Sequence, residues 1–277
     1  MPVIALTHEM GSLAQDVTDR LAHDLHLAIM RHEVVEHVAS KMHVPRSLIN
    51  RLRDGKAGTF ERLTADREGM AVYTAEEVLE LAAQGNVVLR GWGATCLLRP
   101  VPHVLCVRIT RPLPKRVEWL LAELDTDDAD FAEAEIRRSD HAHAARMHEQ
   151  FGVTWGDPLL YDLVLNTERI SVESCVEQIR ALLGRPEFAE TEQSRALLKG
   201  MALQARIRSA LKANDATHAV SITIESVDSG VTLRGIVLKA PERSAAEQVA
   251  AGVPGVTSVD NQLRVMSSSR LFSSSKT

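Results

Sequence analysis

Cysteine is scarce in this chain of 277 residues. Cys96, Cys106 and Cys175 are its three cysteines, and none of them stands in a C-x-x-C pair. An odd number of isolated cysteines argues against a disulfide framework and against a structural zinc site. We therefore expect reduced thiols that are mostly buried.

Long hydrophobic runs are also missing. No stretch approaches the roughly 20 apolar residues that a membrane span needs. The opening "MPVIALTHEM" has a single short apolar run and no basic region before it, which is unlike a secretory signal. The sequence therefore predicts a soluble, cytoplasmic protein without a transmembrane segment.

An excess of positive charge is absent as well, because the formal net charge is -5. Such a chain has no overall field that would attract nucleic acid or anionic lipid, although local basic clusters stay possible. We expect no nucleic acid partner. With 45% hydrophobic and 25% charged residues, the composition is that of a globular protein with room for one medium and one small domain.

Strand and helix patterns alternate over residues 1–183. A buried strand at 3–6 is followed by Leu13, Val17, Leu21 and Leu25 at helical spacing. Valine-rich runs at 86–91 and 103–110 are typical of strands covered on both faces, and 161–167 is one more short apolar strand. This alternation predicts an α/β fold with a parallel sheet.

A different pattern follows the polar, proline-containing segment after residue 183. We predict a linker over 184–202 and a second unit over 203–266, built as helix, two alternating strands, helix and strand. That order, αββαβ, indicates a small α+β domain. The serine-rich tail, 267–277, has too little apolar surface to order and is predicted to be disordered.

Several segments of the first unit resemble the cytidylate kinase-like family, a branch of the P-loop nucleoside monophosphate kinases. They are "THEMGSLAQDVTDRLA", "VVLRGWGATCLL", "VLCVRITRPLPKRVE", "FGVTWGDPLLYDLVLNT" and "ERISVESCVEQI", in the family's order. The resemblance implies a P-loop NTPase-like parallel sheet with flanking helices, nucleotide binding, and ATP with Mg²⁺ as cofactors.

The second unit resembles a BON domain through "GVTLRGIV" and "AAEQVAAGVPGVTSVDNQLRV". This resemblance implies a phospholipid surface or a protein as its partner. A plain packing or homo-oligomerisation module is an equal alternative. The unit carries no catalytic cluster of side chains, so we expect it to bind and not to catalyse.

A phosphate loop is expected where the first strand turns into the first helix. Backbone N–H groups and a helix N-terminus bind phosphate there, and a lysine usually adds charge. The predicted cofactor-binding residues are consecutive: Gly11, Ser12, Leu13, Ala14, Gln15 and Asp16. Ser12 and Asp16 are also the predicted Mg²⁺ ligands. A strand-to-helix turn that binds nothing is the alternative.

The full G-x-x-x-x-G-K-[ST] pattern is absent, because Gln15 stands where many family members have a basic residue. One charge-assisted hydrogen bond contributes about 1.5–3 kcal/mol to binding. A cation that stabilises a transferring phosphoryl group is worth roughly 10³–10⁵ in rate. The change therefore threatens catalysis more than binding.

A lid is implied by "EIRRSDHAHAARM", which resembles the family's R-x-x-D-x-x-R motif. Arg137 and Asp140 match it, while His143 replaces the last arginine. We predict catalytic roles for Arg137, Arg138 and Asp140 in a closing lid. Arg138 or Arg146 could supply the charge that His143 lacks, and a solvated charged helix is an equal alternative.

Substrate contacts are predicted at Arg90 and Trp92, which follow a strand and so lie at the carboxyl edge of the sheet. Trp92 replaces the arginine of the family's G-R-G-A and could stack on a base. Arg31 is the third predicted contact and stands where similar proteins often have an acidic residue, which leaves the base preference open.

Two functions are compatible with these residues. The first is a nucleotide-binding phosphotransferase that moves phosphate from ATP to CMP or a related monophosphate. The alternative is a catalytically degenerate kinase-fold regulator or sensor coupled to the BON-like unit. The substitutions at Gln15, Trp92, His143 and Arg31 favour the alternative.

Overall fold

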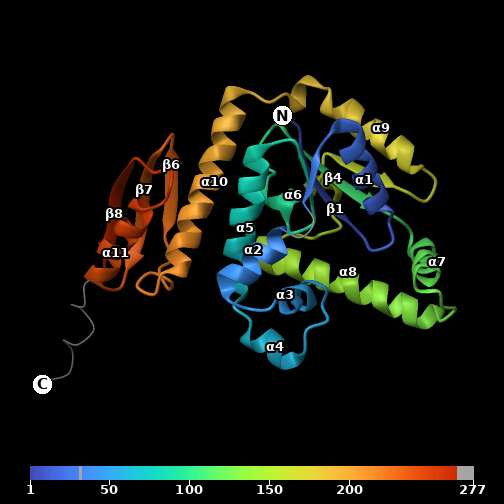
Figure 1. Ribbon diagram of the computed structural model, residues 1–277, viewed down its shortest axis with the longest axis horizontal. Helices are drawn as coiled ribbons and strands as arrows, with labels where there is room; N and C mark the ends of the chain where they lie inside the picture. The colour runs from blue at the N-terminus through green and yellow to red at the C-terminus, as the bar shows by residue number, and fades with distance from the viewer. Residues whose placement is uncertain (31–32, 267–277) are drawn as a thin grey trace, which may run out of the picture. The chain divides into compact units, whose positions relative to one another are not determined.

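The computed structural model describes residues 1–30 and 33–266 (Figure 1). The predicted substrate contact Arg31 and the predicted disordered tail, 267–277, lie outside the described residues. The chain divides into two compact units, one of Met1–Leu198 and one that begins at Lys199. Each unit has its own core.

The first unit is built on a five-stranded parallel sheet, as the valine-rich runs predict. Its strand order is β2-β3-β1-β4-β5. The strands are β1 (Val3–His8), β2 (Ala28–Met30), β3 (Val87–Arg90), β4 (Val104–Thr110) and β5 (Leu163–Asn166). Strands β1, β3 and β4 are almost entirely buried, which is why their sequences are continuous apolar runs and do not alternate.

Helices cover the sheet and extend beyond its carboxyl edge. They are α1 (Ala14–Leu25), α2 (Glu33–Met42), α3 (Arg46–Arg53), α4 (Thr59–Thr64), α5 (Arg67–Gln84), α6 (Ala94–Leu97), α7 (Leu113–Leu124), α8 (Ala129–Phe151) and α9 (Val172–Leu183), with a 3-10 turn at Pro158–Leu160. The main core contains the apolar faces of α1 and α9 together with β1, β3, β4 and β5. Its stability comes from burying the leucine and valine positions that the helical spacing predicts.

The strand order leaves a crevice at the carboxyl end of β1. The chain leaves β1 for the edge strand β2 through α1, returns to β3 beside β1, and then places β4 on the other side of β1. Ligands of open α/β sheets bind where strand order reverses in this way. The loop after β1, the end of β3 and helix α8 all border this crevice.

The second unit has the αββαβ order that the sequence predicts. It consists of α10 (Glu192–Ala213), β6 (Thr223–Val227), β7 (Gly230–Val237), α11 (Ala240–Ala251) and β8 (Ser258–Val265). Strand β6 is antiparallel to β7, and β7 is parallel to β8. Helices α10 and α11 contribute Leu203, Ile207, Leu211, Ala246 and Ala250 to its core.

The segment between the two units is more ordered than a linker needs to be. Residues 184–202 include the 3-10 turn Pro186–Phe188 and the first part of α10. The contact division falls inside α10, between Leu198 and Lys199. The domain limits at 183 and 203 therefore stay a prediction.

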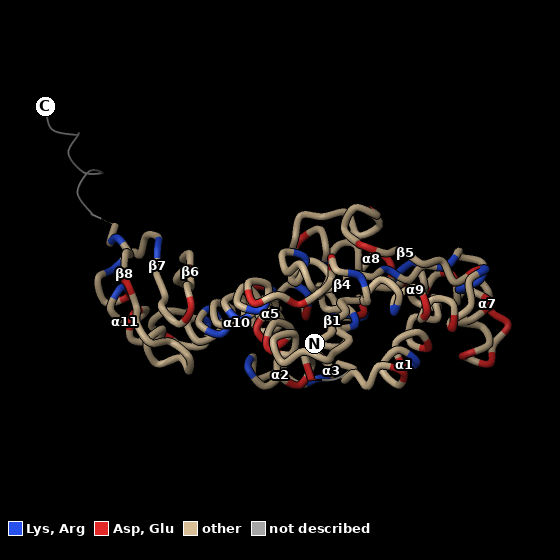
Figure 2. Tube along the Cα trace, turned by 90° about the horizontal axis from the view of Figure 1, so that it is seen from above, with Lys and Arg blue, Asp and Glu red and all other residues tan. Residues whose placement is uncertain are grey.

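Charge and hydropathy are distributed without extremes. Basic and acidic residues are interspersed along the trace of both units (Figure 2). Among the helices that the structure describes, none has both the length and the apolar character needed to cross a membrane.

Candidate functional site

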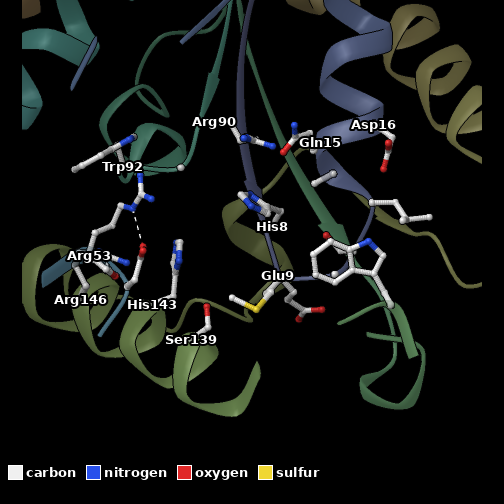
Figure 3. A pocket seen from close by; sticks show the side chains of 18 of the residues that line it. His8, Glu9, Gln15, Asp16, Arg53, Arg90, Trp92, Ser139, His143 and Arg146 are labelled. Carbon is white, nitrogen blue, oxygen red and sulfur yellow. Dashed lines mark hydrogen bonds and ion pairs between the residues drawn. The ribbon is translucent and has the colours of Figure 1, made fainter. Parts of the chain in front are cut away.

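A cavity of about 300 Å³ opens at the carboxyl end of β1 (Figure 3). Its walls come from β1, the following loop, α1, β2, α3, β3, α7 and α8. The lining residues are His8, Glu9, Met10, Gly11, Ser12, Leu13, Ala14, Gln15, Asp16, Met30, Arg53, Asp54, Arg90, Gly91, Trp92, Trp119, Ser139, His143 and Arg146. All six predicted loop residues, together with Arg90 and Trp92, are among them.

The loop between β1 and α1 has a tight conformation that requires glycine at one position. Gly11 has φ +75°, and a Cβ there would lie 2.9 Å from Cε3 of Trp119 and 3.2 Å from Cα of Arg116. Leu13 follows in the left-handed region with φ 58°, a conformation that costs a leucine about 1–2 kcal/mol. The backbone thus keeps a sharp turn at the start of α1 despite the missing lysine.

The N-terminus of α1 presents polar groups without partners. The first N–H groups of a helix have no acceptor within it, and Leu13 at the cap position offers no side-chain acceptor. The Ser12 hydroxyl is buried and has no hydrogen-bond partner among residues 1–30 and 33–266. Amides and a hydroxyl arranged in this way fit an anion, with or without a hard cation beside it.

The Ser12 carbonyl is held from the opposite side of the sheet edge. Thr167, just after β5, donates its hydroxyl to that carbonyl at 2.8 Å. The N–H of Ser12 itself donates to the Glu9 carbonyl at 3.2 Å. Because backbone contacts already fix Ser12, its hydroxyl is available for a ligand.

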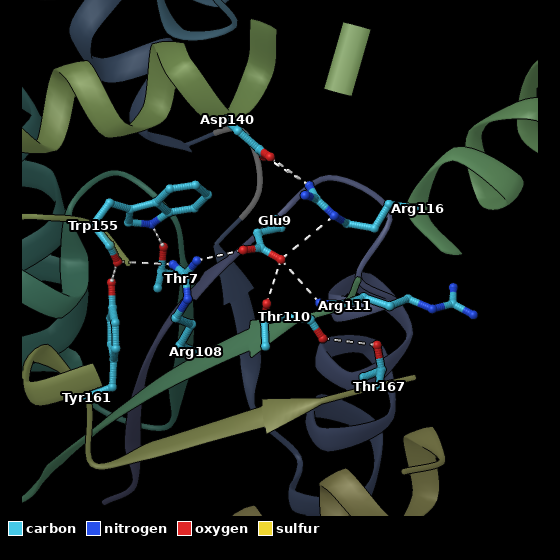
Figure 4. A network of polar contacts seen from close by, with 10 residues as sticks. All are labelled: Thr7, Glu9, Arg108, Thr110, Arg111, Arg116, Asp140, Trp155, Tyr161 and Thr167. Atoms are coloured by element: carbon cyan, nitrogen blue, oxygen red, sulfur yellow. Dashed lines mark hydrogen bonds and ion pairs between the residues drawn. The ribbon is translucent and has the colours of Figure 1, made fainter. Parts of the chain in front are cut away.

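A buried network around Glu9 anchors the beginning of the loop (Figure 4). The Glu9 carboxylate accepts hydrogen bonds from Arg108 Nη2 at 2.8 Å, the Thr110 hydroxyl at 2.6 Å and the Arg111 backbone N–H at 3.2 Å. Arg116 lies 3.8 Å from the same carboxylate. We call these five residues the Glu9 network. It binds the loop firmly to the end of β4.

Arg108 is enclosed by aromatic side chains on the far side of the network. Its guanidinium lies 4.3 Å above the ring of Trp155 and 5.7 Å from that of Tyr161, and it donates to the Trp155 carbonyl at 3.2 Å. The Trp155 indole N–H in turn donates to the Thr7 hydroxyl at 3.0 Å. These contacts satisfy the buried charge and fix the direction of the carboxyl end of β1.

The predicted lid residues lie on α8 but do not line the cavity. Asp140 accepts two hydrogen bonds from Arg116 Nη1, at 2.9 and 3.1 Å. Burial raises the pKa of Asp140, and Arg116 opposes that rise. Arg137 pairs with Glu133 at 2.7 Å, and Arg138 pairs with Glu135. Their catalytic roles stay predictions that need a movement of α8.

A different face of α8 meets the cavity. Ser139, His143 and Arg146 line it, and their spacing of four and three residues places them on one side of the helix. The imidazole of His143 stacks on Trp155 with ring centroids 4.6 Å apart. In the sequence, His143 stands where the family motif has an arginine, and the pattern favours neither Arg138 nor Arg146 as its replacement.

The end of α3 contributes residues that the sequence analysis did not select. Arg53 and Asp54 line the cavity, and the Arg53 guanidinium lies 5.3 Å from the centroid of the Trp92 ring. The polar stretch 53–59 predicts an exposed loop, whereas Arg53 is the last residue of α3. No local sequence pattern identifies Arg53 as a cavity residue, because its place in the cavity depends on how α3 packs against the sheet.

Two histidines in the cavity are neutral. The pKa of His8 is lowered from 6.5 to about 3 by burial, with further contributions from Arg90, Arg53 and Arg108. The pKa of His143 is also well below its usual range, because of burial and then Arg146. Burial is the larger cause of both shifts, and the neighbouring arginines act in the same direction.

A preformed metal centre is not part of this arrangement. In the described part of the chain, no group of three His, Cys, Asp or Glu side chains is placed to hold a metal ion. Mg²⁺ in kinase sites needs only one or two protein ligands, since substrate phosphates and waters complete its shell. The unpartnered Ser12 hydroxyl and the Asp16 carboxylate at the cavity fit that requirement.

Comparison with known families and proteins agrees with this fold. The model of the cytidylate kinase-like family matches residues 3–169, and the BON domain model matches residues 201–267. A cytidylate kinase of Staphylothermus marinus is 28% identical over 121 residues, which are 44% of this chain and 67% of that protein.

Solved structures resemble the first unit at low sequence identity. An uncharacterized protein from Eubacterium ventriosum is 16% identical with a TM-score of 0.53, covering 67% of this chain and 100% of its own. A shikimate kinase from Bacteroides thetaiotaomicron has 16% identity and a TM-score of 0.42, covering 66% of this chain and 99% of its own. The first of these supports the fold and nothing more specific.

Proposed function

Because the chain belongs to the cytidylate kinase-like family, we propose that its first unit binds a nucleotide by its phosphates and transfers a phosphoryl group from ATP to CMP or a related monophosphate. One observation carries the proposal. The uncapped N-terminus of α1 and the buried, unpartnered Ser12 hydroxyl open together into the cavity. An anion is the ligand that such donors stabilise.

Each predicted residue has a defined role in this proposal. The amides of residues 11 and 13–16 bind the phosphates of ATP, because the Ser12 N–H already donates to the Glu9 carbonyl. Ser12 with Asp16 would hold Mg²⁺, which neutralises charge on the transferring group. Arg90 and Trp92 contact the acceptor, as does Arg31. Arg137, Arg138 and Asp140 act when α8 moves toward the cavity as a lid.

A regulator without catalysis is the second candidate. Gln15 lines the cavity in place of a lysine, and a neutral amide cannot neutralise charge that develops on a transferring phosphoryl group. Backbone amides still bind phosphate in that case. The first unit would then sense a nucleotide and pass its state to the BON-like unit.

The second unit is proposed to bind a phospholipid surface or a protein partner. This part of the proposal rests on the BON domain match. A homo-oligomer formed through the same unit is the alternative, and the whole protein is proposed to act in the cytoplasm.

Two measurements on the full-length protein separate the candidates. A coupled assay follows ATP consumption with CMP, UMP, AMP and GMP in turn, and calorimetry follows binding of ATP–Mg²⁺. Turnover with one monophosphate supports the kinase, and saturable ATP binding without turnover supports the sensor. The absence of both binding and turnover contradicts the nucleotide proposal.

The loop itself is tested by Gln15→Lys, which restores the cation of the family pattern. Under the kinase proposal we expect turnover to rise by about 10-fold or more, since transition-state cations are worth up to roughly 10³–10⁵ in rate. An unchanged rate would show that the missing lysine is not what limits catalysis.

A further inference from the structure

Tryptophan is concentrated at the cavity, although aromatic residues make up only 4% of the chain. Two of the three tryptophans, Trp92 and Trp119, line the cavity. The third, Trp155, stacks on the cavity residue His143. They come from different parts of the chain, since Trp92 follows β3, Trp119 lies on α7 and Trp155 follows α8. All three indoles therefore gather at or directly behind one site.

Two of these tryptophans have partners within the protein. Trp155 is 6% exposed, donates its indole N–H to the Thr7 hydroxyl at 3.0 Å and has the Arg108 guanidinium 4.3 Å from its ring. The ring of Trp92 has the Arg53 guanidinium at 5.3 Å. The protein itself therefore provides a contact for each of these two rings.

Trp119 differs from the other two. Its indole is partly buried against the apolar cluster of α7 and α8 that contains Leu120, Ala132 and Ile136. Among residues 1–30 and 33–266, its N–H has no hydrogen-bond partner and its ring has no aromatic or cationic partner. The indole is therefore supported by the helices and open to the cavity.

Trp119 lies against the loop that is proposed to bind phosphates. A Cβ on Gly11 would lie 2.9 Å from Cε3 of Trp119, so the indole is in direct contact with the loop. Trp92 lies on the other side of the cavity from Gln15 and Asp16 in Figure 3. Of the two tryptophans that line the cavity, Trp119 is therefore the one placed beside a ligand of the loop.

The chemistry of an indole restricts what that ligand can offer it. An indole has a large π face, one N–H donor and no positive charge. Such a side chain binds a phosphate poorly but stacks well on a planar nucleobase. The two fused rings of a purine cover more of an indole than the single ring of a pyrimidine does. The bare face of Trp119 therefore favours a purine base.

We propose that Trp119 is the stacking surface for the base of the nucleotide whose phosphates the loop binds, and that this nucleotide is a purine nucleoside triphosphate. The inference rests on the proposed function, because it assumes that phosphates occupy the loop. Trp119 is then a specificity-determining residue that acts on the base and not on the phosphates. Stacking compensates for part of the affinity that the loop loses because Gln15 carries no charge.

Calorimetric titrations of the full-length protein test the stacking surface. Wild type, Trp119→Leu and Trp119→Phe are each titrated with the Mg²⁺ complexes of ATP, CTP and tripolyphosphate, which has the phosphates without a base. Wild type should bind ATP more tightly than CTP. We expect Trp119→Leu to weaken ATP binding about 5- to 100-fold, the effect of removing one ring from a stacked base, and tripolyphosphate binding less than about twofold. Trp119→Phe should recover part of the loss because it keeps an aromatic ring.

Phe131→Leu is the matched control, because Phe131 is an exposed aromatic residue of α8 outside the cavity lining. It should change none of the three affinities. Thermal unfolding of every variant verifies that it is folded, and the phenylalanine variant keeps the test valid if the leucine variant is unstable.

The outcomes separate the stacking surface from the proposed function. Equal losses of ATP and tripolyphosphate affinity in Trp119→Leu would show that Trp119 only supports the loop, and they overturn the inference. Unchanged ATP affinity in that variant, or stronger binding of both ligands, also overturns it. Equal binding of ATP and CTP by wild type overturns the assignment of a purine. Wild type that binds tripolyphosphate as tightly as ATP overturns the stacking surface and leaves phosphate binding by the loop intact, whereas wild type that binds none of the ligands overturns the proposed function as well.

Discussion

The two units of the chain treat charge in different ways. Among the described residues, the first unit buries the charged side chains of Glu76, Arg108 and Arg116, whereas the second buries only the hydroxyl residues Ser209 and Thr217. Ion pairs of the second unit, such as Glu225 with Arg234, stay about half exposed. The first unit therefore maintains charges in places where they are costly, and the second does not.

The comparison indicates where binding chemistry is concentrated. A buried ion pair often stabilises a fold no better than apolar side chains of similar volume would. The Glu9 network instead holds the loop after β1 and connects it, through Arg116, to Asp140 on α8. We interpret these buried charges as the means by which the first unit positions its cavity, whereas the core of the second unit is apolar.

The largest expected effect breaks the network at its centre. Glu9→Ala leaves Arg108 and Arg116 without their shared carboxylate and should reduce the free energy of unfolding by about 3–5 kcal/mol. Urea denaturation measures this change in the free energy of unfolding. Glu225→Ala, which removes the exposed partner of Arg234, should stay within about 0.5 kcal/mol. Equal losses would contradict the contrast between the units.

A core substitution in the second unit tests whether the units are independent. Leu233 is fully buried on β7, and Leu233→Ala should cost that unit about 2–5 kcal/mol through lost burial and a cavity. Nucleotide affinity of the first unit should not change. Calorimetry of unfolding and of binding on the same sample checks both, and a parallel loss of affinity would show that the units are coupled.

The buried histidine makes the stability of the first unit depend on pH. The folded pKa of His8 is about 3 and its ordinary value is 6.5, so between these values the unfolded chain binds the extra proton. Stability from this group is complete above pH 6.5 and falls below it by about 1.4 kcal/mol per pH unit, or about 2 kcal/mol at pH 5.

Because other groups titrate in the same range, the measurement is a difference. Urea denaturation of wild type and of His8→Asn is compared at pH 7 and pH 5. The stability of wild type should fall more steeply over this interval. Parallel falls would show that His8 is not held neutral by the fold.

The smallest of these effects on stability is expected at the loop. Gly11→Ala forces a side chain into a left-handed conformation and into Trp119, which should cost about 1–2 kcal/mol. Its effect on ATP affinity should exceed that of Gly152→Ala, a left-handed glycine at the end of α8 with open space around it. Similar ATP affinities for the Gly11→Ala and Gly152→Ala variants would show that nucleotide binding does not depend on the conformation of the loop.

Much of the fold follows from local patterns. Continuous valine-rich runs predict the buried strands β3 and β4, and the spacing of Val17 and Leu21 predicts the buried face of α1. The αββαβ order of the second unit follows from alternating strands around the turn at 228–230. Hydrophobic period and turn residues are properties of neighbouring residues, so no tertiary information is needed for them.

The candidate site could be predicted only in part. Residues 11–16 line the cavity. They could be predicted because a loop from a strand to a helix is a local feature of the sequence. Helix α8 could not be oriented in the same way. Its charged residues are spread along the sequence, and its buried residues are few: Ala132, Ile136 and Met147. Its hydrophobic pattern does not reveal whether Arg137 or Arg146 faces the cavity.

Sequence by itself determined the order of strands and helices along the chain and the place of the turn from β1 into α1, because both depend on residues close together in the chain. Only the tertiary structure decided that Arg53 and Arg146 meet beside Trp92, and that Asp140 pairs with Arg116. Those contacts join residues 24 and 93 positions apart. They depend on how whole helices pack on the sheet, which no local spacing of polar residues encodes.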